Sequence, residues 1–148
     1  MNKNLAITVL TWNDWKNTIE CLESIYQSDY NQFDVILVDN NSDKIHLDKI
    51  YDWSKNKIQV EDKEIDFNPN KKIEIIEIDN NFKIKELGRK KIYLIKNLIN
   101  IGLTAGLNIG YKFCEQQNYD YIARVDCDFI ITKQYFKTII STLENDKK

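Results

Sequence analysis

The sequence predicts an α/β fold in which a doubly wound, mostly parallel sheet is flanked by helices. Two observations lead to this class. Short, nearly continuous apolar runs, such as Leu5 to Thr11 and Phe33 to Asp39, are typical of parallel strands that are buried on both faces. These runs alternate along the chain with segments that have apolar residues at helical spacing. Such alternation is the pattern of a βαβ sheet with right-handed crossovers.

The chain up to Ser42 reads as strand, helix and strand. After the run at residues 5–11, Asn13 or Asp14 can cap a helix. Four apolar residues then follow at helical spacing: Trp15, Ile19, Leu22 and Tyr26. The second strand, at residues 33–39, ends in a run of short polar side chains that is typical of a turn.

Residues 43–90 are interpreted as a variable excursion within the domain. The segment is polar and rich in lysine, and we expect it to lie away from the chemistry. Residues 45–53 could form a short helix. Period-two alternation at residues 58–60 and 73–78, around Asn68-Pro69-Asn70, indicates a hairpin.

Regular patterns return after residue 90. A strand is expected at residues 91–95, and a helix from about Thr104 to Gln117. Tyr119 to Val125 is the next strand, and it leads into Asp126-Cys127-Asp128. Thr132 can cap a last helix. The apolar residues of that helix form one stripe: Phe136, Ile139, Ile140 and Leu143.

Length, charge and cysteine content narrow the class of protein. A chain of 148 residues corresponds to one domain, and its net charge of −2 argues against a general nucleic-acid binder. The three cysteines form no CxxC pair, which favours a reducing, cytoplasmic setting. The single His46 lies in a polar stretch and is expected at the surface. Neither a signal peptide nor a membrane-spanning run is evident in the sequence. Peripheral docking at the inner face of a membrane is compatible with this.

Four polar clusters follow the predicted strands and form the strongest functional signal. They are Thr11 to Asn13, Asp39 to Asn41, Asn97 to Gly102, and Asp126 to Asp128. Ligands of such sheets bind beyond the carboxyl ends of the strands, near the point where the strand order reverses. We therefore expect the four clusters to form one binding edge.

Asp126 and Asp128 are the candidate metal ligands. Two carboxylates one residue apart in extended backbone point to the same side. Mg²⁺ or Mn²⁺ takes such oxygen ligands while keeping positions open for phosphate oxygens. The alternative interpretation is two solvated aspartates at the end of a strand. Cys127, between them, is interpreted as a small packing residue, because no base is evident that would activate it as a nucleophile.

Three glycines recur at four-residue intervals: Gly102, Gly106 and Gly110. A glycine inside a helix costs roughly 1 kcal/mol relative to alanine. Two in one helix therefore require a reason, which is either room for a nucleotide or sugar, or close packing of the helix on the sheet. Asp39 has two interpretations as well, because it could accept hydrogen bonds from a base or ribose, or cap its own turn. Trp12 and Trp15 could stack on a base, although core packing is the more common use.

Taken in order, these segments resemble family 2 glycosyltransferases. Ile7 to Asn13 (ITVLTWN) is similar to that family's first strand, with Trp12 in place of the usual tyrosine. Val35 to Ser42 (VILVDNNS) resembles its second strand and acidic turn. Asn100 to Gly110 resembles a glycine-containing segment of the rhamnosyltransferase-like branch. Tyr121 to Asp128 (YIARVDCD) resembles the strand that leads into the family's metal-binding Asp-x-Asp motif.

The resemblance implies a GT-A, Rossmann-like fold and inverting transfer of a sugar from a nucleotide-diphosphate sugar, with a UDP- or dTDP-linked donor favoured. The acceptor would be a saccharide or a lipid-linked molecule in cell-envelope polysaccharide or glycoconjugate synthesis. By motif match, the nucleotide-sugar site would comprise Thr11, Asn13, Asp39, Asn41, Asn100, Gly102, Gly106, Asn108 and Asp126. Asp126 and Asp128 would hold Mn²⁺ or Mg²⁺, which stabilises a leaving diphosphate as a Lewis acid.

The chain departs from the family pattern after the Asp-x-Asp motif. Family members continue into an acceptor-binding half that supplies the catalytic base, whereas residues 1–148 match only the nucleotide-sugar-binding part. We therefore expect a truncated chain and assign no catalytic residue. Self-association into a homo-oligomer could cover an open sheet edge. Two alternatives stay open: a non-catalytic nucleotide-binding or interaction module, and a phosphatase of the haloacid dehalogenase type, although in the latter the Asp-x-Asp follows the first strand.

Overall fold

The computed structural model describes residues 3–59, 65–79, 81–84 and 87–146. In this part of the chain, five parallel strands form one sheet in the order β3-β4-β2-β1-β5. The strands are β1 (Leu5–Thr11), β2 (Phe33–Asp39), β3 (Ile75–Ile78), β4 (Ile92–Lys96) and β5 (Tyr121–Arg124). The helices are α1 (Trp15–Tyr26), α2 (Lys44–Ser54), α3 (Leu103–Gln116) and α4 (Tyr135–Asn145). The predicted α/β class is confirmed.

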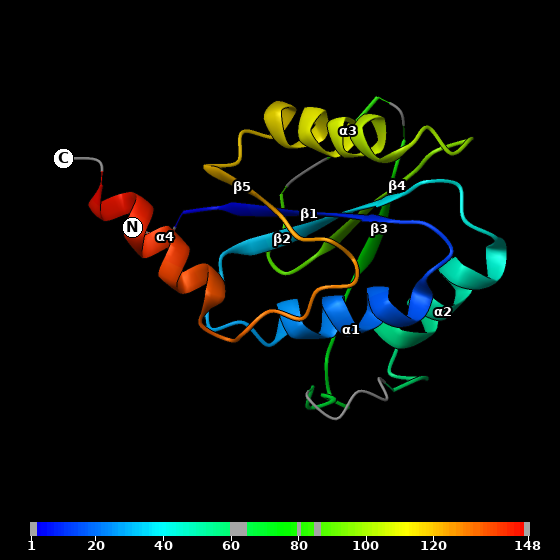
Figure 1. Cartoon of the computed structure of the whole chain (residues 1–148), viewed down its shortest axis with the longest axis horizontal. Coiled ribbons are helices and arrows are strands. Elements are labelled where there is room, and N and C mark those ends of the chain that lie inside the picture. The colour runs from blue at the N-terminus through cyan, green and yellow to red at the C-terminus, as the bar shows by residue number, and fades with distance from the viewer. Residues whose placement is uncertain (1–2, 60–64, 80, 85–86, 147–148) are drawn as a thin grey trace.

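Helices cover both faces of the sheet. Figure 1 shows α3 on one face and α1 and α2 on the other, with α4 on the α1 side near the start of β1. The chain passes from β1 to β2 in one direction, whereas β5 pairs with the opposite side of β1. The strand order therefore reverses between β1 and β5. Because ligands of open α/β sheets bind at such a point, the ends of these two strands are the first place to look for a site.

The central strands are buried on both sides, as their continuous apolar sequence predicts. Within β2, Val35 and Leu37 belong to the core cluster that contains the buried residues of α1. Ile36 and Val38 belong to the cluster on the other face, together with Phe113 of α3. This division follows from the alternation of side chains along a strand.

Two glycines bring α3 close to the sheet. A Cβ atom on Gly106 would lie 2.7 Å from Leu10 Cδ1, and one on Gly110 would lie 3.2 Å from Val38 Cγ2. Both glycines are buried. These contacts favour the packing explanation for the glycine spacing, because the missing side chains give the helix room to approach the strands.

The helix boundaries confirm one predicted cap and correct another. The Asp14 carboxylate accepts a hydrogen bond from the Asn17 N–H at 3.4 Å and caps α1, as predicted. The cap predicted at Thr132 is wrong, because α4 begins only at Tyr135. The Tyr135 N–H donates to the Thr132 carbonyl at 3.1 Å, so Thr132 opens a separate turn before the helix. No helix in the described ranges is long and apolar enough to cross a membrane.

The hairpin predicted at residues 58–60 and 73–78 is wrong for the described residues. β3 pairs in parallel with β4, with Ile75 opposite Ile92, whereas residues 58 and 59 are not in a strand and residue 60 lies outside the described ranges. A parallel pair cannot be closed by a tight turn and requires a longer connection. Residues 43–90 therefore form helix α2 and contribute β3 to the sheet as an edge strand.

A buried ion pair fastens the segment before β3 to α1. Lys71 Nζ lies 3.2 Å from Glu23 Oε2, and both side chains are buried. Trp53 Nε1 donates to the same carboxylate at 2.7 Å, and the Lys71 ammonium lies 3.9 Å from the ring centre of Phe67. Burial lowers the pKa of Lys71, and the Glu23 carboxylate partly opposes that effect. The lysine that the sequence places in a polar stretch is thus part of the packed interior.

Candidate functional site

Hydrogen bonds join the loops that follow β1 and β2 at the carboxyl edge of the sheet. The Asn13 N–H donates to Ser42 Oγ at 2.9 Å, and the Asn13 side-chain oxygen accepts from the Asp43 N–H at 2.8 Å. Asn13 and Asn41 have φ values of 51° and 67°. Asparagine is one of the few residues other than glycine that adopts this left-handed region readily. The asparagines of both motifs therefore shape the loops.

Asn40 joins the loop after β2 to the loop after β4. Its side-chain nitrogen donates to Asn100 Oδ1 at 2.8 Å and to the Gly102 carbonyl at 3.2 Å. Its side-chain oxygen accepts from Asn97 Nδ2 at 3.0 Å and from the Ile101 N–H at 3.1 Å. The buried Asn40 amide thus uses both its donor and its acceptor group to hold residues 97–102 in place.

Asp39 ends β2 opposite Thr11, and Trp12 is the first residue after β1, but the exposure of Asp39 and Trp12 differs. Asp39 is 2% exposed, and its two carboxylate oxygens lie 3.3 and 3.2 Å from the Ser42 N–H. This contact is the turn-capping role, and it leaves lone pairs for a further donor. Trp12 is 55% exposed, so the core-packing interpretation is wrong for this residue. Trp15, by contrast, packs against the core cluster.

His46 is buried beneath this edge, which corrects its predicted surface position. It is 1% exposed, and its Nε2 lies 2.9 Å from Thr11 Oγ1. Thr11 Oγ1 in turn lies 2.7 Å from Thr18 Oγ1, which donates to the Asp14 carbonyl at 2.6 Å. Because each hydroxyl has one hydrogen, Thr11 must donate to Thr18 and accept from His46. His46 is therefore protonated on Nε2, and burial lowers its pKa against the opposing effect of Asp39.

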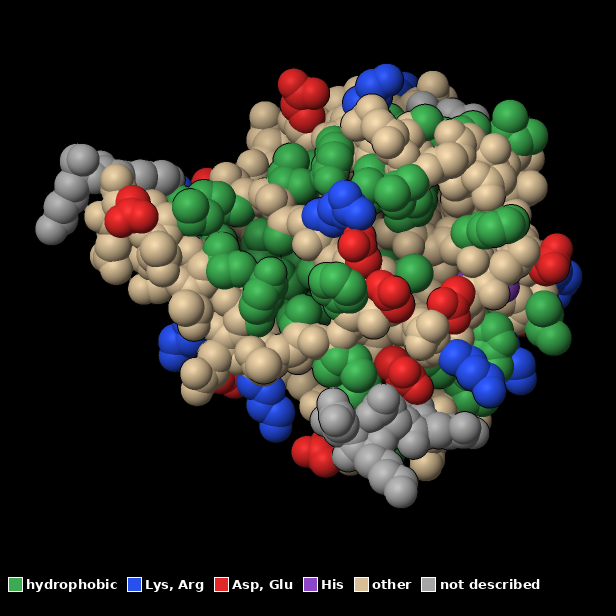
Figure 2. Space-filling view, viewed as in Figure 1, with side chains coloured by type: hydrophobic (Ala, Val, Ile, Leu, Met, Phe, Trp, Pro, Cys, Tyr) green, Lys and Arg blue, Asp and Glu red, His purple; other side chains and the backbone are tan. Residues whose placement is uncertain are grey.

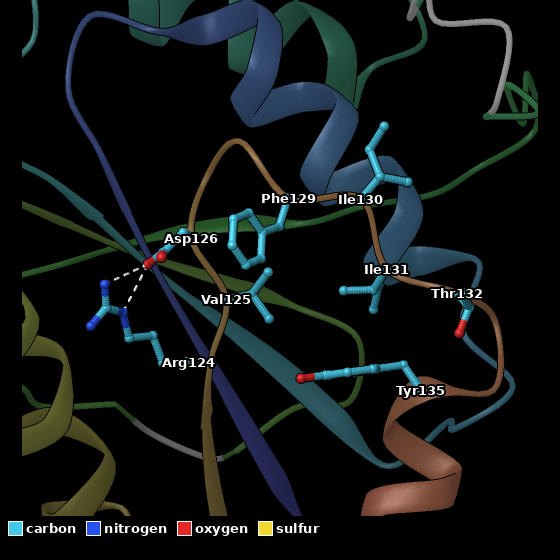
Figure 3. A pocket seen from close by; sticks show the side chains of 8 residues that line it. All are labelled: Arg124, Val125, Asp126, Phe129, Ile130, Ile131, Thr132 and Tyr135. Carbon is cyan, nitrogen blue, oxygen red and sulfur yellow. Dashed lines mark hydrogen bonds and ion pairs between the residues drawn. The ribbon is translucent and has the colours of Figure 1, made fainter.

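The acidic motif, Asp126-Cys127-Asp128, follows β5. Its first aspartate forms an ion pair with Arg124 that was not predicted from the sequence. Arg124 donates from Nε and Nη2 to Asp126 Oδ1 at 2.8 and 2.7 Å, as Figure 3 shows. The two side chains are two residues apart, so extended backbone places them on the same side of the strand. That spacing was visible in the sequence and could have identified the pair. Asp128 is exposed.

An apolar cavity of about 390 Å³ adjoins this pair. Figure 3 shows its walls between the end of β5 and the start of α4. The lining residues are Arg124, Val125, Asp126, Phe129, Ile130, Ile131, Thr132 and Tyr135. The carboxylate therefore lies at the border between a polar edge and an apolar hollow.

The residues of the acidic motif fit one kind of metal site and not another. Within the described ranges, no group of three or more His, Cys, Asp and Glu side chains could hold a metal ion. Mg²⁺ and Mn²⁺ bind to one or two carboxylates when water and substrate phosphates supply the other ligands. Asp126 also has its charge balanced by Arg124. The donor set thus fits a cation that is shared with a bound diphosphate, and it does not fit a cation held by the protein alone.

The structure gathers most, but not all, of the predicted site residues at the carboxyl edge. Those at or just beyond the ends of β1, β2, β4 and β5 are Thr11, Asn13, Asp39, Asn41, Asn100, Gly102, Asp126 and Asp128. Thr11 is buried and directs its hydroxyl inward. Gly106 lies against Leu10 inside the helix–sheet contact. Asn108 lies further along α3, in a groove that Ile122 of β5 also lines.

Comparison with known proteins identifies the fold. No known family model matches the sequence, and no curated protein matches it either. Solved structures do match. Staphylococcus aureus TarS 1-349 in complex with UDP superposes with a TM-score of 0.64 at 19% identity, covering 96% of this chain and 32% of that one. The mannosyltransferase PcManGT from Pyrobaculum calidifontis, in complex with GDP-Man and Mn²⁺, gives 0.66 at 15% identity, covering 97% and 33%.

The chain has the fold of these proteins. It spans about a third of the length of each. The predicted GT-A-type arrangement of a parallel sheet with flanking helices is thereby confirmed.

Proposed function

We propose that this chain is the donor-binding domain of a glycosyltransferase and binds a nucleotide-diphosphate sugar at its carboxyl edge. The proposal rests on the position of Trp12, Asp39 and Asp126, which lie at or just beyond the carboxyl ends of β1, β2 and β5, beside the point where the strand order reverses. The fold adds support, because it is shared with proteins crystallised with UDP and with GDP-Man and Mn²⁺.

The nucleoside would lie over the ends of β1 and β2. Trp12 offers an exposed ring for stacking on a base. The Asp39 carboxylate, held by the Ser42 N–H, is placed to accept a hydrogen bond from a base or ribose. Asn13 and Asn41 contribute mainly by fixing the conformation of the loops that follow β1 and β2.

The diphosphate would lie toward the end of β5. Asp126 and Asp128 would share a Mn²⁺ or Mg²⁺ ion with it, and the ion when bound neutralises the charge of the leaving group. Besides the metal ion, Arg124 is a candidate partner for a phosphate oxygen, because its guanidinium is half-exposed and already positioned by Asp126. With a diphosphate bound, Arg124 would turn from Asp126 to a phosphate oxygen, which would leave the Asp126 carboxylate available to hold the ion.

The finer assignments extend the same proposal. Asn100 and Gly102 would border the sugar, because Asn40 holds their loop at the same edge. Family 2 membership in the rhamnosyltransferase-like branch, inverting transfer, and an acceptor in cell-envelope polysaccharide synthesis are the expectations that product analysis would test.

Calorimetric titration with UDP, dTDP and GDP, each with and without Mn²⁺, tests the proposal. We expect one nucleotide to bind at least tenfold more tightly with Mn²⁺, and Mn²⁺ alone to bind weakly. The Asp126→Ala/Asp128→Ala variant should lose the metal effect. The Asp48→Ala/Asp52→Ala variant removes the same charge from α2 and should bind like the wild type. Absence of nucleotide binding by the folded wild-type chain would refute the proposal and favour an interaction module.

A further inference from the structure

We propose that helix α1 positions the acidic motif for a cation shared with a diphosphate, through a polar stripe formed by Thr18, Cys21 and Ser24. The inference rests on the proposed function and adds positioning residues to the same site. The three side chains recur every three residues along α1 and therefore lie on one side of the helix. All three are buried, with at most 4% of their surface exposed. Buried polar side chains need hydrogen-bond partners, and these partners identify what the stripe holds.

The segment that carries the motif has no regular structure of its own. β5 ends at Arg124 and α4 begins at Tyr135, and residues 125–134 lie in neither a strand nor a helix. Figure 1 shows this segment, in orange, passing along α1 before it reaches α4. Its backbone groups therefore depend on local turns and on partners in other elements.

Successive residues of the stripe hold the segment at two points of its backbone. The Cys21 thiol donates to the Asp126 carbonyl at 3.5 Å, and Ser24 Oγ accepts from the Ile131 N–H at 3.1 Å. Asp128 lies in the chain between these two anchor points. The contacts with α1 therefore restrict the backbone that carries both aspartates.

Thr18 supplies a third anchor, at the middle of the motif. Its hydroxyl donates to the Asp14 carbonyl at 2.6 Å and lies 2.7 Å from Thr11 Oγ1. Burial raises the pKa of the Cys127 thiol, and a hydrogen bond with the Thr18 side chain acts in the opposite direction. A hydroxyl has one hydrogen and two lone pairs, so these three partners use its whole capacity. Thr18 thus joins the end of β1 to the acidic motif.

The anchors carry no charge, which suits a motif that binds a cation. Figure 2, seen from the same side as Figure 1, shows acidic side chains near the middle of this face, with apolar side chains beside them. Burial raises the pKa of the Cys21 thiol, and the nearby Asp128 and Asp126 carboxylates raise it further. Carboxylates this close repel one another, so their segment needs an anchor. Hydroxyl and thiol groups hold the backbone and leave the negative charge for the cation.

Replacement of Ser24 by alanine tests the proposal against a matched control in α2. Ser24 and Ser54 are both buried, and each donates to the carbonyl of the residue three positions earlier, at 2.7 and 2.8 Å. Ser24 also holds Ile131. The measured quantity is the ratio of nucleotide affinities with and without Mn²⁺, by calorimetry with whichever of UDP, dTDP and GDP the wild type binds.

We expect Ser24→Ala to lower this ratio about three- to tenfold, which is the net contribution of one hydrogen bond, and Ser54→Ala to leave it unchanged. Equal losses of affinity with and without Mn²⁺ in Ser24→Ala would overturn the proposal, because they would indicate a general weakening of the fold. Thr18→Val removes the hydroxyl at nearly constant volume and should lower the ratio as well, whereas Thr18→Ser keeps the hydroxyl and should restore it. A Thr18→Ser variant that behaves like Thr18→Val would exclude a role for the hydroxyl.

Amide hydrogen exchange on the nucleotide-free chain separates this inference from the proposed function. The Phe129 N–H donates to the Asp126 carbonyl at 3.0 Å, so its exchange rate reports on the turn of the motif. Exchange at Phe129 should be faster in Ser24→Ala than in the wild type and unchanged in Ser54→Ala. If the wild type binds no nucleotide, the proposed function fails, and the exchange rates alone decide whether α1 positions the motif. Equal rates in the wild type and both variants would overturn the inference.

Discussion

Asp34 is a buried carboxylate in β2 whose replacement by asparagine should stabilise the protein at neutral pH. Its side chain is 3% exposed and accepts hydrogen bonds from the Lys91 N–H at 3.0 Å and from the Tyr119 hydroxyl at 3.1 Å. Burial raises the pKa of Asp34 from 3.8 to about 6, although both hydrogen bonds act in the opposite direction. Asparagine can accept from Lys91 through its oxygen and donate to the Tyr119 oxygen, so the substitution keeps both contacts.

The sign of the effect follows from proton linkage. The folded state binds the Asp34 proton more tightly than the unfolded state does, so ionisation of Asp34 destabilises the fold. The cost is complete above pH 6, declines as the pH falls from 6 to 3.8, and is absent at lower pH. The difference between the two pKa values corresponds to about 3 kcal/mol at most. Allowing for relaxation around the charge, we expect Asp34→Asn to add about 1–3 kcal/mol at pH 7.5.

Urea denaturation at pH 7.5, 6 and 5 measures this effect. The gain from Asp34→Asn in the free energy of unfolding should shrink as the pH falls toward 5. Asp48→Asn, at an exposed ion pair on α2, controls for the loss of one negative charge and should change stability by less than about 0.5 kcal/mol. A loss of stability in Asp34→Asn that is equal at all three pH values would refute the linkage reasoning, because it would show that the carboxylate contributes by shape or hydrogen bonding alone.

Three further predictions concern the loops, the core and the exposed ring. Asn40→Ala removes four hydrogen bonds at a buried position and should lower the free energy of unfolding by about 1–3 kcal/mol, with weaker nucleotide binding in the same titration. Lys71→Ala leaves the Glu23 carboxylate buried without its cation and should cost about 3–5 kcal/mol in urea denaturation, whereas Glu23→Gln/Lys71→Met should recover most of that loss. Trp12→Ala should change stability by less than about 0.5 kcal/mol but abolish most of the tryptophan quenching caused by a bound nucleotide, and unchanged quenching would exclude stacking at this ring.

In the described part of the chain, four of the five strands lie where the sequence predicts them: β4 and the half-buried β5 within two residues, and the nearly fully buried β1 and β2 at the predicted bounds. β1 and β2 lie at the predicted residues because a strand with a helix on each face must be apolar throughout. β3 was assigned to a hairpin from its alternating character. Over only four residues, that alternation fits a hairpin strand and a parallel edge strand equally well. His46 was misplaced for another reason. Its sequence neighbours are polar, and its burial depends on Thr11, a residue of a different strand.

The predicted site divides into residues that hold the loops and residues that are open to a ligand. The asparagines of the carboxyl edge are engaged by other loops: Asn13 with Ser42 and Asp43, and Asn40 with residues 97–102. A motif search cannot separate the two groups, because a side chain that positions a loop and one that contacts a ligand can lie in the same short segment.

This division has an energetic consequence for binding. Loops that are already fixed by hydrogen bonds need not be ordered when a ligand arrives, so less of the interaction energy is lost to conformational entropy. The groups proposed for direct contact are then few: Trp12, Arg124, Asp126 and Asp128, which are exposed or half-buried, and Asp39, which is 2% exposed. Variants of the exposed contact residues should weaken nucleotide binding while leaving the fold stable, whereas Asn40→Ala should lower both nucleotide affinity and stability. Because the two classes predict different ratios of stability loss to affinity loss, measuring both quantities on the same variants separates a preorganised donor site from a surface that is merely polar.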